Sequence, residues 1–72
     1  MSETHRTVDI RGDTIRLGQL LKLAGLVGAG GEAKELLAEG AVRVNGEREE
    51  RRGRQLHPGD EVSVGGETVR VA

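Results

Sequence analysis

The stretch that most constrains the fold is residues 17–46, where two short helical patterns are each followed by a glycine. In the first pattern, apolar residues recur at the i, i+3, i+4 and i+7 spacing of one buried helical face: Leu17, Leu20, Leu21 and Ala24. In the second, Ala33, Leu36 and Leu37 repeat that spacing. Gly25 and Gly40 follow the two patterns, where a left-handed helix stop favours glycine. Helices shorter than roughly 12 residues are marginal alone in water, so we expect the two to exist only as a packed pair.

Alternating apolar residues around this helix pair predict the strands of a small sheet. Val42 and Val44 leave Arg43 on the opposite face, and Asn45-Gly46 is a strong hairpin signal. The other alternating pairs are Val8 and Ile10, Val62 and Val64, and Val69 and Val71. We therefore predict an α+β fold, with a helix hairpin packed on a small, mostly antiparallel β-sheet.

Turn residues separate these elements. Pro58-Gly59 has the residues of a type II turn, and Gly65-Gly66 fits a two-residue hairpin loop. Gly18 is the expected N-cap of the first helix. We expect one domain over residues 1–72, with residues 1–6 loose.

The composition argues against several classes of function. The 72 residues contain no cysteine and two isolated histidines, which disfavours a disulfide framework and a metal site. The N-terminal segment lacks the apolar core of a signal peptide, and no apolar run could span a membrane, so we expect a soluble cytoplasmic protein. The net charge of −1 gives no support for a polyanionic partner. Any such case rests on where the charges lie.

The most basic segment lies within residues 47–57, which are almost entirely charged. Arg51, Arg52 and Arg54 form its only stretch free of acids, and three glutamates precede them, at 47, 49 and 50. Guanidinium groups match phosphate oxygens in a bidentate geometry. A solvated loop with internal ion pairs fits the same residues, and on charge alone the solvated loop is favoured.

A glycine-rich segment, residues 28–31, precedes the second helix. N–H groups at a helix start can hold a phosphate. No strand leads into this segment and no Gly-Lys-Ser/Thr follows it, so a connection between the helices is the favoured interpretation. Catalysis has little support, because Glu35 and Glu39 fit an exposed helix face and Ser63 has no histidine beside it.

The chain contains no aromatic residue, and this limits how it could recognise RNA. Proteins that bind single strands stack the bases on aromatic rings. Any RNA that this chain binds is therefore expected to be recognised through helical shape, phosphates and 2′-hydroxyls.

An ordered set of short motifs resembles the S-four domain, or αL motif, an RNA-binding domain first described in the fourth protein of the small ribosomal subunit. The motifs are Ile15-Arg16-Leu17, Leu20-Leu21, Gly25-Leu26, Glu32-Ala33-Lys34, Leu36, Gly40, Val42-Arg43-Val44-Asn45-Gly46 and Pro58-Gly59-Asp60. The chain is most similar to the small stand-alone bacterial subfamily, which shares Leu-Leu-Lys-Leu at 20–23, Gly-Gly-Glu-Ala-Lys at 30–34 and Arg-Arg-Gly-Arg at 51–54.

The resemblance implies a basic surface on the helix pair and the adjoining strand and loop that contacts structured RNA, with no catalysis and no cofactor. Carried over by position, the RNA-binding residues are Lys22, Lys34, Arg43, Asn45, Arg51, Arg52 and Arg54. With the resemblance, contact with RNA is favoured over a solvated loop for Arg51, Arg52 and Arg54. Alanine at 51, 52 and 54 is then expected to weaken binding without unfolding the protein.

The sequence departs from the family pattern at one place. Many relatives begin the second helix with Ser or Thr followed by Arg, whereas Ala29 and Gly30 stand there in this chain. The change removes a helix cap and one cation, which limits contact at that helix start to backbone N–H groups.

Three functions remain to be compared with the structure. The leading one is a non-catalytic, monomeric RNA-binding module that acts on ribosomal RNA, tRNA or another structured RNA. The alternative is a ribosome-associated protein–protein adaptor without direct RNA contact, which an exposed apolar patch would favour. An enzyme subunit would need a concave pocket with converging polar groups.

Overall fold

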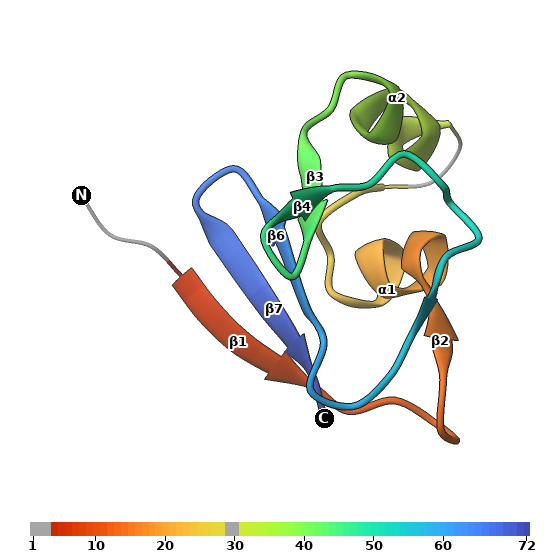
Figure 1. Cartoon of the computed structure of the whole chain (residues 1–72), viewed down its shortest axis with the longest axis vertical. Coiled ribbons are helices and arrows are strands. Elements are labelled where there is room, and N and C mark those ends of the chain that lie inside the picture. Colours follow the sequence, from red (N-terminus) through yellow and green to blue (C-terminus); the bar gives the residue numbers. More distant parts are fainter. Residues whose placement is uncertain (1–3, 29–30) are drawn as a thin grey trace.

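The computed structural model describes residues 4–28 and 31–72 (Figure 1). In the described residues, the elements follow one another in the order β1 (Thr4–Val8), β2 (Ile15–Arg16), α1 (Leu17–Leu23), α2 (Glu32–Ala38), β3 (Val42–Val44), β4 (Glu47–Arg48), β5 (Gln55–Leu56), β6 (Glu61–Val64) and β7 (Glu67–Val71). The chain is thus a small α+β protein, as predicted. Neither α1 nor α2, the helices in the described part of the chain, has the length and apolar character needed to cross a membrane.

The strands form two sheets. Five strands lie in the order β1-β7-β6-β3-β4, and β2 pairs with β5 in a separate two-stranded sheet. Every pair is antiparallel except β1 with β7, which is parallel. The prediction of a mostly antiparallel sheet is confirmed. Figure 1 shows the five-stranded sheet on the left, with α1 and α2 both to its right and β2 beside α1.

The core is entirely aliphatic, because the chain has no aromatic residue to bury. Leu17, Leu20 and Leu21 of α1 are completely buried, as their helical spacing predicts. The remaining buried apolar residues come from α2, the strands and the turns beside them: Ala24, Val27, Ala33, Leu37, Val42, Val44, Leu56, Val62, Val69 and Val71. One cluster therefore joins both helices to both sheets, and it fixes where the polar face of each element points.

The turns follow the sequence signals. Asn45 and Gly46 both have positive φ, 53° and 87°, as a two-residue type I′ hairpin between β3 and β4 requires. Gly25 and Gly40 adopt φ of 73° and 77° just past the two helices. The glycine stops of both helices and the β3–β4 hairpin turn are therefore confirmed.

The first strand differs from the prediction. The alternation of Val8 and Ile10 predicted a strand that contains both residues, with residues 1–6 loose, but β1 is Thr4–Val8 and ends before Ile10. The expectation of loose residues is wrong for residues 4–6, and residues 1–3 lie outside the described part. Long-range contacts explain the difference: β1 pairs along β7, and the guanidinium of Arg6 donates to the carbonyl of Ala24 and to Glu67.

The start of α1 also differs from the prediction. Gly18 lies inside the helix and is buried, and Arg16 is the N-cap residue, without a side-chain capping bond. A Cβ atom built on Gly18 would lie 2.5 Å from Cγ of Arg52. Glycine is therefore needed here for close approach of another segment, and not for capping.

Candidate nucleic-acid interface

Residues 49–54, called the arginine loop below, connect β4 to β5 and rest on the beginning of α1. The N–H of Leu17 donates to the carbonyl of Arg54 at 2.8 Å, and the N–H of Gly18 donates to the carbonyl of Arg52 at 2.9 Å. The first N–H groups of a helix have no partner within the helix. The arginine loop supplies these partners and so takes the place of a side-chain cap.

Glu49 anchors the arginine loop from inside. Its side chain is 8% exposed, and its carboxylate accepts hydrogen bonds from the N–H groups of Glu50 and Arg51, both at 3.0 Å. The guanidinium of Arg51 donates to both carboxylate oxygens at 3.1 Å, and that of Arg54 donates to Oε1 at 3.0 Å. The hydrogen bonds from Arg51, with that from Arg54, outweigh burial and lower the pKa of Glu49 to about 2.

Sequence reasoning missed this role of Glu49, because three glutamates of similar surroundings precede the arginines. Glu47 and Glu50 are exposed, whereas Glu49 is buried. Its N–H donates to the carbonyl of Val42 at 3.0 Å, which directs the chain inward just after β4. No local pattern marks one of these acids as the buried one.

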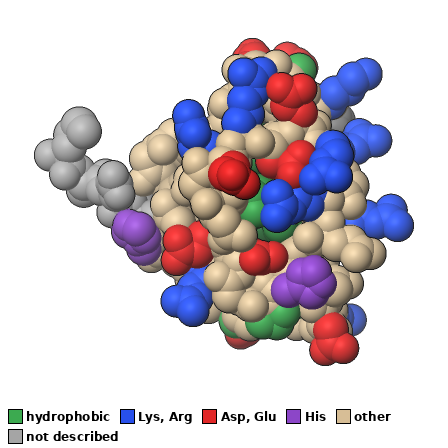
Figure 2. Space-filling view, viewed as in Figure 1, with side chains coloured by type: hydrophobic (Ala, Val, Ile, Leu, Met, Phe, Trp, Pro, Cys, Tyr) green, Lys and Arg blue, Asp and Glu red, His purple; other side chains and the backbone are tan. Residues whose placement is uncertain are grey.

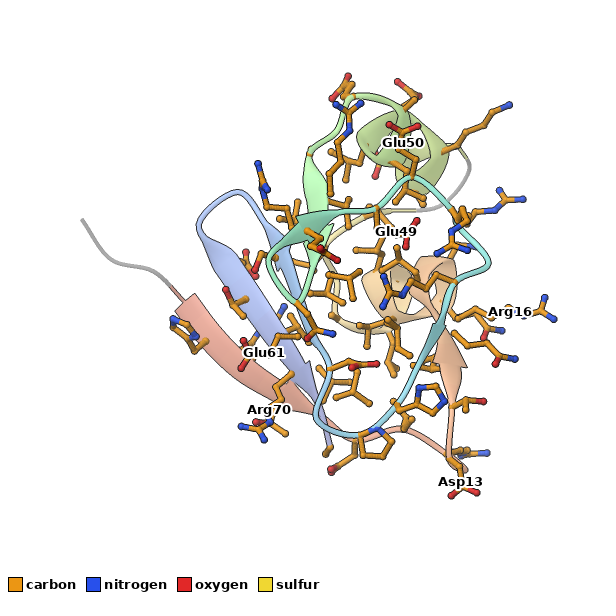
Figure 3. All side chains as sticks on the ribbon, viewed as in Figure 1. Asp13, Arg16, Glu49, Glu50, Glu61 and Arg70 are labelled. Atoms are coloured by element: carbon orange, nitrogen blue, oxygen red, sulfur yellow. The ribbon has the colours of Figure 1, made fainter. Side chains whose placement is uncertain are left out.

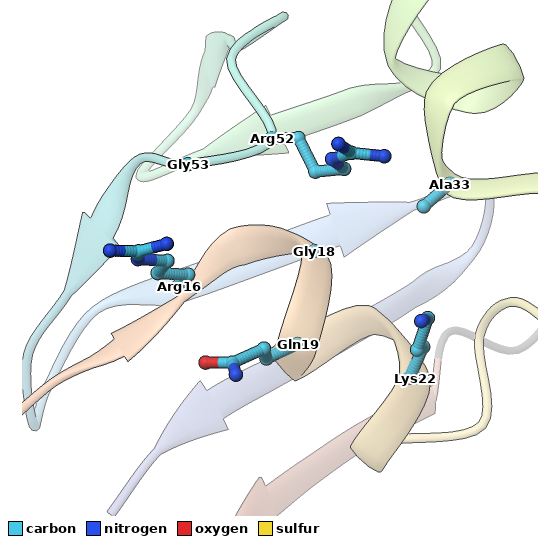
Figure 4. A pocket seen from close by; sticks show the side chains of 7 residues that line it. All are labelled: Arg16, Gly18, Gln19, Lys22, Ala33, Arg52 and Gly53. Carbon is cyan, nitrogen blue, oxygen red and sulfur yellow. The ribbon is translucent and has the colours of Figure 1, made fainter. Parts of the chain in front are cut away.

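Cationic side chains from three segments surround a groove over the first turns of α1 (Figure 4). This basic groove has a volume of about 560 Å³, and its lining residues are Arg16, Gly18, Gln19, Lys22, Ala33, Arg52 and Gly53. Arg16 comes from β2, Lys22 from α1 and Arg52 from the arginine loop. Within residues 4–28 and 31–72, none of these three cations has a carboxylate within salt-bridge distance.

A second hollow extends the basic groove towards α2. It has a volume of about 440 Å³ and is lined by Lys34, Leu37, Ala38, Glu50 and Arg52. Arg52 lines both hollows, so Lys34 continues the line of cations. Glu50 is the acid in this hollow, and its carboxylate already pairs with Arg48 at 2.9 Å.

Figure 2 shows the result on the surface: Lys and Arg side chains gather along the right-hand margin, where Figure 1 places α2, the arginine loop and β2. Figure 3 places Arg16 on that margin, while Arg70 lies on the opposite, lower left side, near Glu61. A nearly neutral molecule therefore has one margin rich in cations.

The structure brings together part of the set of RNA-binding residues that the sequence suggested. Lys22, Lys34 and Arg52 line the two adjoining hollows. Arg51 and Arg54 belong to the arginine loop, but both are bonded to Glu49, with their side chains 75% and 30% exposed.

Two of the suggested residues lie elsewhere. Arg43 is exposed on β3, and its guanidinium donates to the carbonyl of Gly46 at 3.2 Å. The amide of Asn45 donates to Asp60 at 3.1 Å and accepts from the N–H of Glu61 at 3.0 Å, so it ties the β3–β4 hairpin to the start of β6. Neither residue lines the basic groove or the hollow beside it.

The expectation that alanine at 51, 52 and 54 leaves folding intact is also corrected. Replacing Arg51, Arg52 and Arg54 together would leave the buried carboxylate of Glu49 without its guanidinium partners. Leaving a buried charged group without its hydrogen bonds is costly. The triple variant is therefore expected to lower stability as well as binding.

The start of α2 is acidic where it is described. Glu32 and Glu35 lie in its first turn, and the carboxylate of Glu32 accepts a hydrogen bond from the N–H of Gly28. Ala29 and Gly30, at the departure from the family pattern, lie outside the described residues. The N–H of Gly28 is therefore already occupied by an acid of the chain itself.

Comparison with known proteins agrees with the sequence resemblance. The profile of the S4 domain, the S-four domain named above, matches residues 8–72. A protein of Bacillus subtilis (strain 168), described as the probable ribosome maturation protein RlbA, is 48% identical over 59 residues, which cover 82% of this chain and 83% of that protein. S4 domains are in general RNA-binding domains. The chain belongs to the S4 domain family.

Proposed function

We propose that this chain is a non-catalytic RNA-binding module whose basic groove contacts the phosphate backbone of structured RNA. The observation that carries the proposal is the convergence of Arg16 and Lys22, at the N-cap and in the last turn of α1, with Arg52 of the arginine loop, in one groove without carboxylate partners among the described residues. In this proposal, α1 and α2 packed on the sheet form the helix hairpin of the αL motif, and residues 1–72 act as one module.

The chemistry of the groove fits a phosphate backbone. Guanidinium groups bind phosphate oxygens through paired N–H donors, and an ammonium group adds a compact charge. Neutralising phosphates releases condensed counterions, which drives binding and makes it sensitive to salt. Lys34 extends the cations beyond the groove and offers the RNA backbone a further contact.

The relative suggests which RNA to test first. Its name places it in ribosome maturation, and ribosomal RNA is structured RNA. We therefore propose a fragment of ribosomal RNA with an uninterrupted stem as the first ligand, with the ribosome as the wider partner. The absence of aromatic residues supports an RNA stem over an unpaired strand.

The test is a titration of this chain with an RNA hairpin at several salt concentrations, repeated for Lys22→Ala/Arg52→Ala. Each phosphate contact contributes roughly 0.7–0.9 to the slope of log affinity against log salt. The double variant is expected to reduce that slope by about 1.4–1.8 and to weaken binding by roughly tenfold or more at 0.1 M salt.

The matched control is Arg43→Ala/Arg70→Ala, which removes the same charge from exposed strand residues outside the groove. We expect its slope to stay close to that of the unaltered chain. If both double variants weaken binding equally, the assignment to the groove is wrong. If the unaltered chain binds no hairpin RNA at low salt but binds a ribosomal protein, the adaptor is the correct function.

The surface itself gives the adaptor little support. Among the described residues, Leu23 is the single large apolar side chain that is strongly exposed. Interaction sites for proteins more often show a contiguous apolar patch. The basic groove is thus the better-defined surface.

A further inference from the structure

We infer that Glu49 is a positioning residue for RNA binding: its carboxylate presets the arginine loop so that Arg52 stands in the basic groove. The inference rests on the proposed function. It assigns to an acid a favourable role in binding a polyanion, so that removal of this negative charge is expected to weaken binding.

The first support is where the carboxylate points. Its two oxygens accept five hydrogen bonds, all from the arginine loop: from the N–H groups of Glu50 and Arg51 and from the guanidinium groups of Arg51 and Arg54. An acid that only opposed a phosphate would face the solvent. Glu49 instead lies inside the loop, with its side chain 8% exposed, while Arg51 remains 75% exposed.

The second support is that the loop is held from both sides of Arg52. The carboxylate of Glu49 fixes residues 50, 51 and 54, and the N–H groups of Leu17 and Gly18 hold the carbonyls of Arg54 and Arg52. The side chain of Arg52 thus leaves a backbone that is restrained before any ligand arrives. A loop whose backbone is already ordered loses less conformational entropy on binding.

The third support is Gly18, which makes room for Arg52. A Cβ atom at this position would lie 2.5 Å from Cγ and 3.2 Å from Cδ of Arg52. Glycine is a poor helix former, yet Gly18 is the second residue of α1 and is buried. The close approach of the Arg52 side chain explains why glycine stands at this position.

Simple electrostatics and positioning predict opposite signs for Glu49→Gln. Removing one negative charge and releasing two guanidinium groups would by itself strengthen binding to RNA. If Glu49 acts by presetting the loop, the variant binds hairpin RNA more weakly, by roughly two- to tenfold at the same salt concentration, because Arg52 must be ordered on binding.

The matched control is Glu47→Gln, which removes the same charge two residues earlier, from an exposed side chain of β4. We expect it to bind as tightly as the unaltered chain or more tightly. Weaker binding by Glu49→Gln together with unchanged or tighter binding by Glu47→Gln supports the inference. Binding by Glu49→Gln that equals or exceeds that of the unaltered chain overturns it.

Gly18→Ala provides the test if Glu49→Gln does not fold. Alanine favours the helix, so α1 is retained, but its methyl group would lie 2.5 Å from Cγ of Arg52 and forces that side chain to shift. We expect weaker binding by Gly18→Ala in the unaltered background and no further effect in the Arg52→Ala background. The inference requires that binding depends on where Arg52 is placed, so equal losses in both backgrounds, or no loss in either, overturn it.

These outcomes separate the inference from the proposed function. If the unaltered chain does not bind hairpin RNA at low salt, both fail. If it binds with the expected salt slope while Glu49→Gln and Gly18→Ala bind equally well, the function stands and the positioning role is wrong.

Discussion

The basic groove carries three cationic side chains and the strands of the five-stranded sheet carry four, but the surroundings of the two sets differ. In the groove, Arg16, Lys22 and Arg52 have no carboxylate within salt-bridge distance among the described residues. The strand cations are Arg6, Arg43, Arg48 and Arg70.

Acids accompany three of the strand cations. Arg6 pairs with Glu67 at 3.2 Å, and Arg48 pairs with Glu50 at 2.9 Å. Arg70 lies opposite Glu61 in the β6–β7 register. Residues directly opposite each other in antiparallel strands are neighbours on one face, which brings such charges together. The groove instead has no acid among its lining residues, and Glu49 of the arginine loop is buried beneath the arginines. The location of the acids, more than the number of cations, distinguishes the two regions.

The largest expected effect concerns the acids themselves. Glu49→Ala is expected to lower the free energy of unfolding by roughly 1–3 kcal/mol, because it removes a buried carboxylate that accepts several charge-assisted hydrogen bonds. Glu50→Ala removes one exposed ion pair, and roughly 0–1 kcal/mol is expected. Urea denaturation of both variants at neutral pH measures the difference. Equal losses of unfolding free energy would contradict the distinction between a buried, bonded Glu49 and an exposed Glu50.

The next effect is on acid stability. The pKa of Glu49 falls from an ordinary value of 4.5 to about 2 in the folded chain, mainly through hydrogen bonds from Arg51. A carboxyl whose pKa is lowered by folding stabilises the protein above its unfolded pKa, and this stabilisation is lost as the pH falls towards the folded value. The contribution of Glu49 is therefore complete above about pH 5 and lost progressively down to about pH 2.

The measurement is the free energy of unfolding as a function of pH, for the unaltered chain and for Glu49→Gln. The pKa of Asp60 is also lowered, by the hydrogen bonds from His57 and Asn45, so both proteins lose some stability in acid. The difference between the two curves isolates Glu49 and should narrow between pH 5 and pH 2. A difference that stays constant over this range would contradict the buried ionised carboxylate.

The smallest expected effect is the change in RNA affinity when a single charge is reversed. Lys22→Glu is expected to weaken hairpin RNA binding by roughly fivefold or more at 0.1 M salt, because a phosphate contact is lost. Arg70→Glu makes the same charge change on the strand side, and less than a twofold effect is expected, because screening limits the reach of an exposed charge to about 10 Å at this salt concentration. Equal effects would show that net charge alone governs binding.

Much of the fold could be predicted because its signals are local. The spacing of Leu17, Leu20 and Leu21 predicted the buried face of α1, and Asn45-Gly46 predicted the hairpin. The alternation of Val8 and Ile10 was misleading, because β1 is determined by pairing with β7 near the other end of the chain. An edge strand can begin wherever its partner extends, and the sequence around the strand does not carry that information.

The candidate site could be predicted only in part. The family motifs pointed to Lys22, Lys34 and Arg52, which the structure places around two adjoining hollows. They also pointed to two residues outside these hollows. Arg43 donates to the Gly46 carbonyl in the β3–β4 hairpin, and Asn45 bonds to Asp60 and Glu61 at the start of β6.

By itself, the sequence determined two short helices, an aliphatic core and hairpin turns, since each depends on residues within a few positions of one another. Only the tertiary structure decided that Glu49 is buried while Glu47 and Glu50 are exposed, and that Arg16, Lys22 and Arg52 share one groove. The physical reason is that the effect of a charge depends on its solvation and on its neighbours in space. For this chain, folding brings the arginine loop beside β2 and α1, which lie far from it in the sequence.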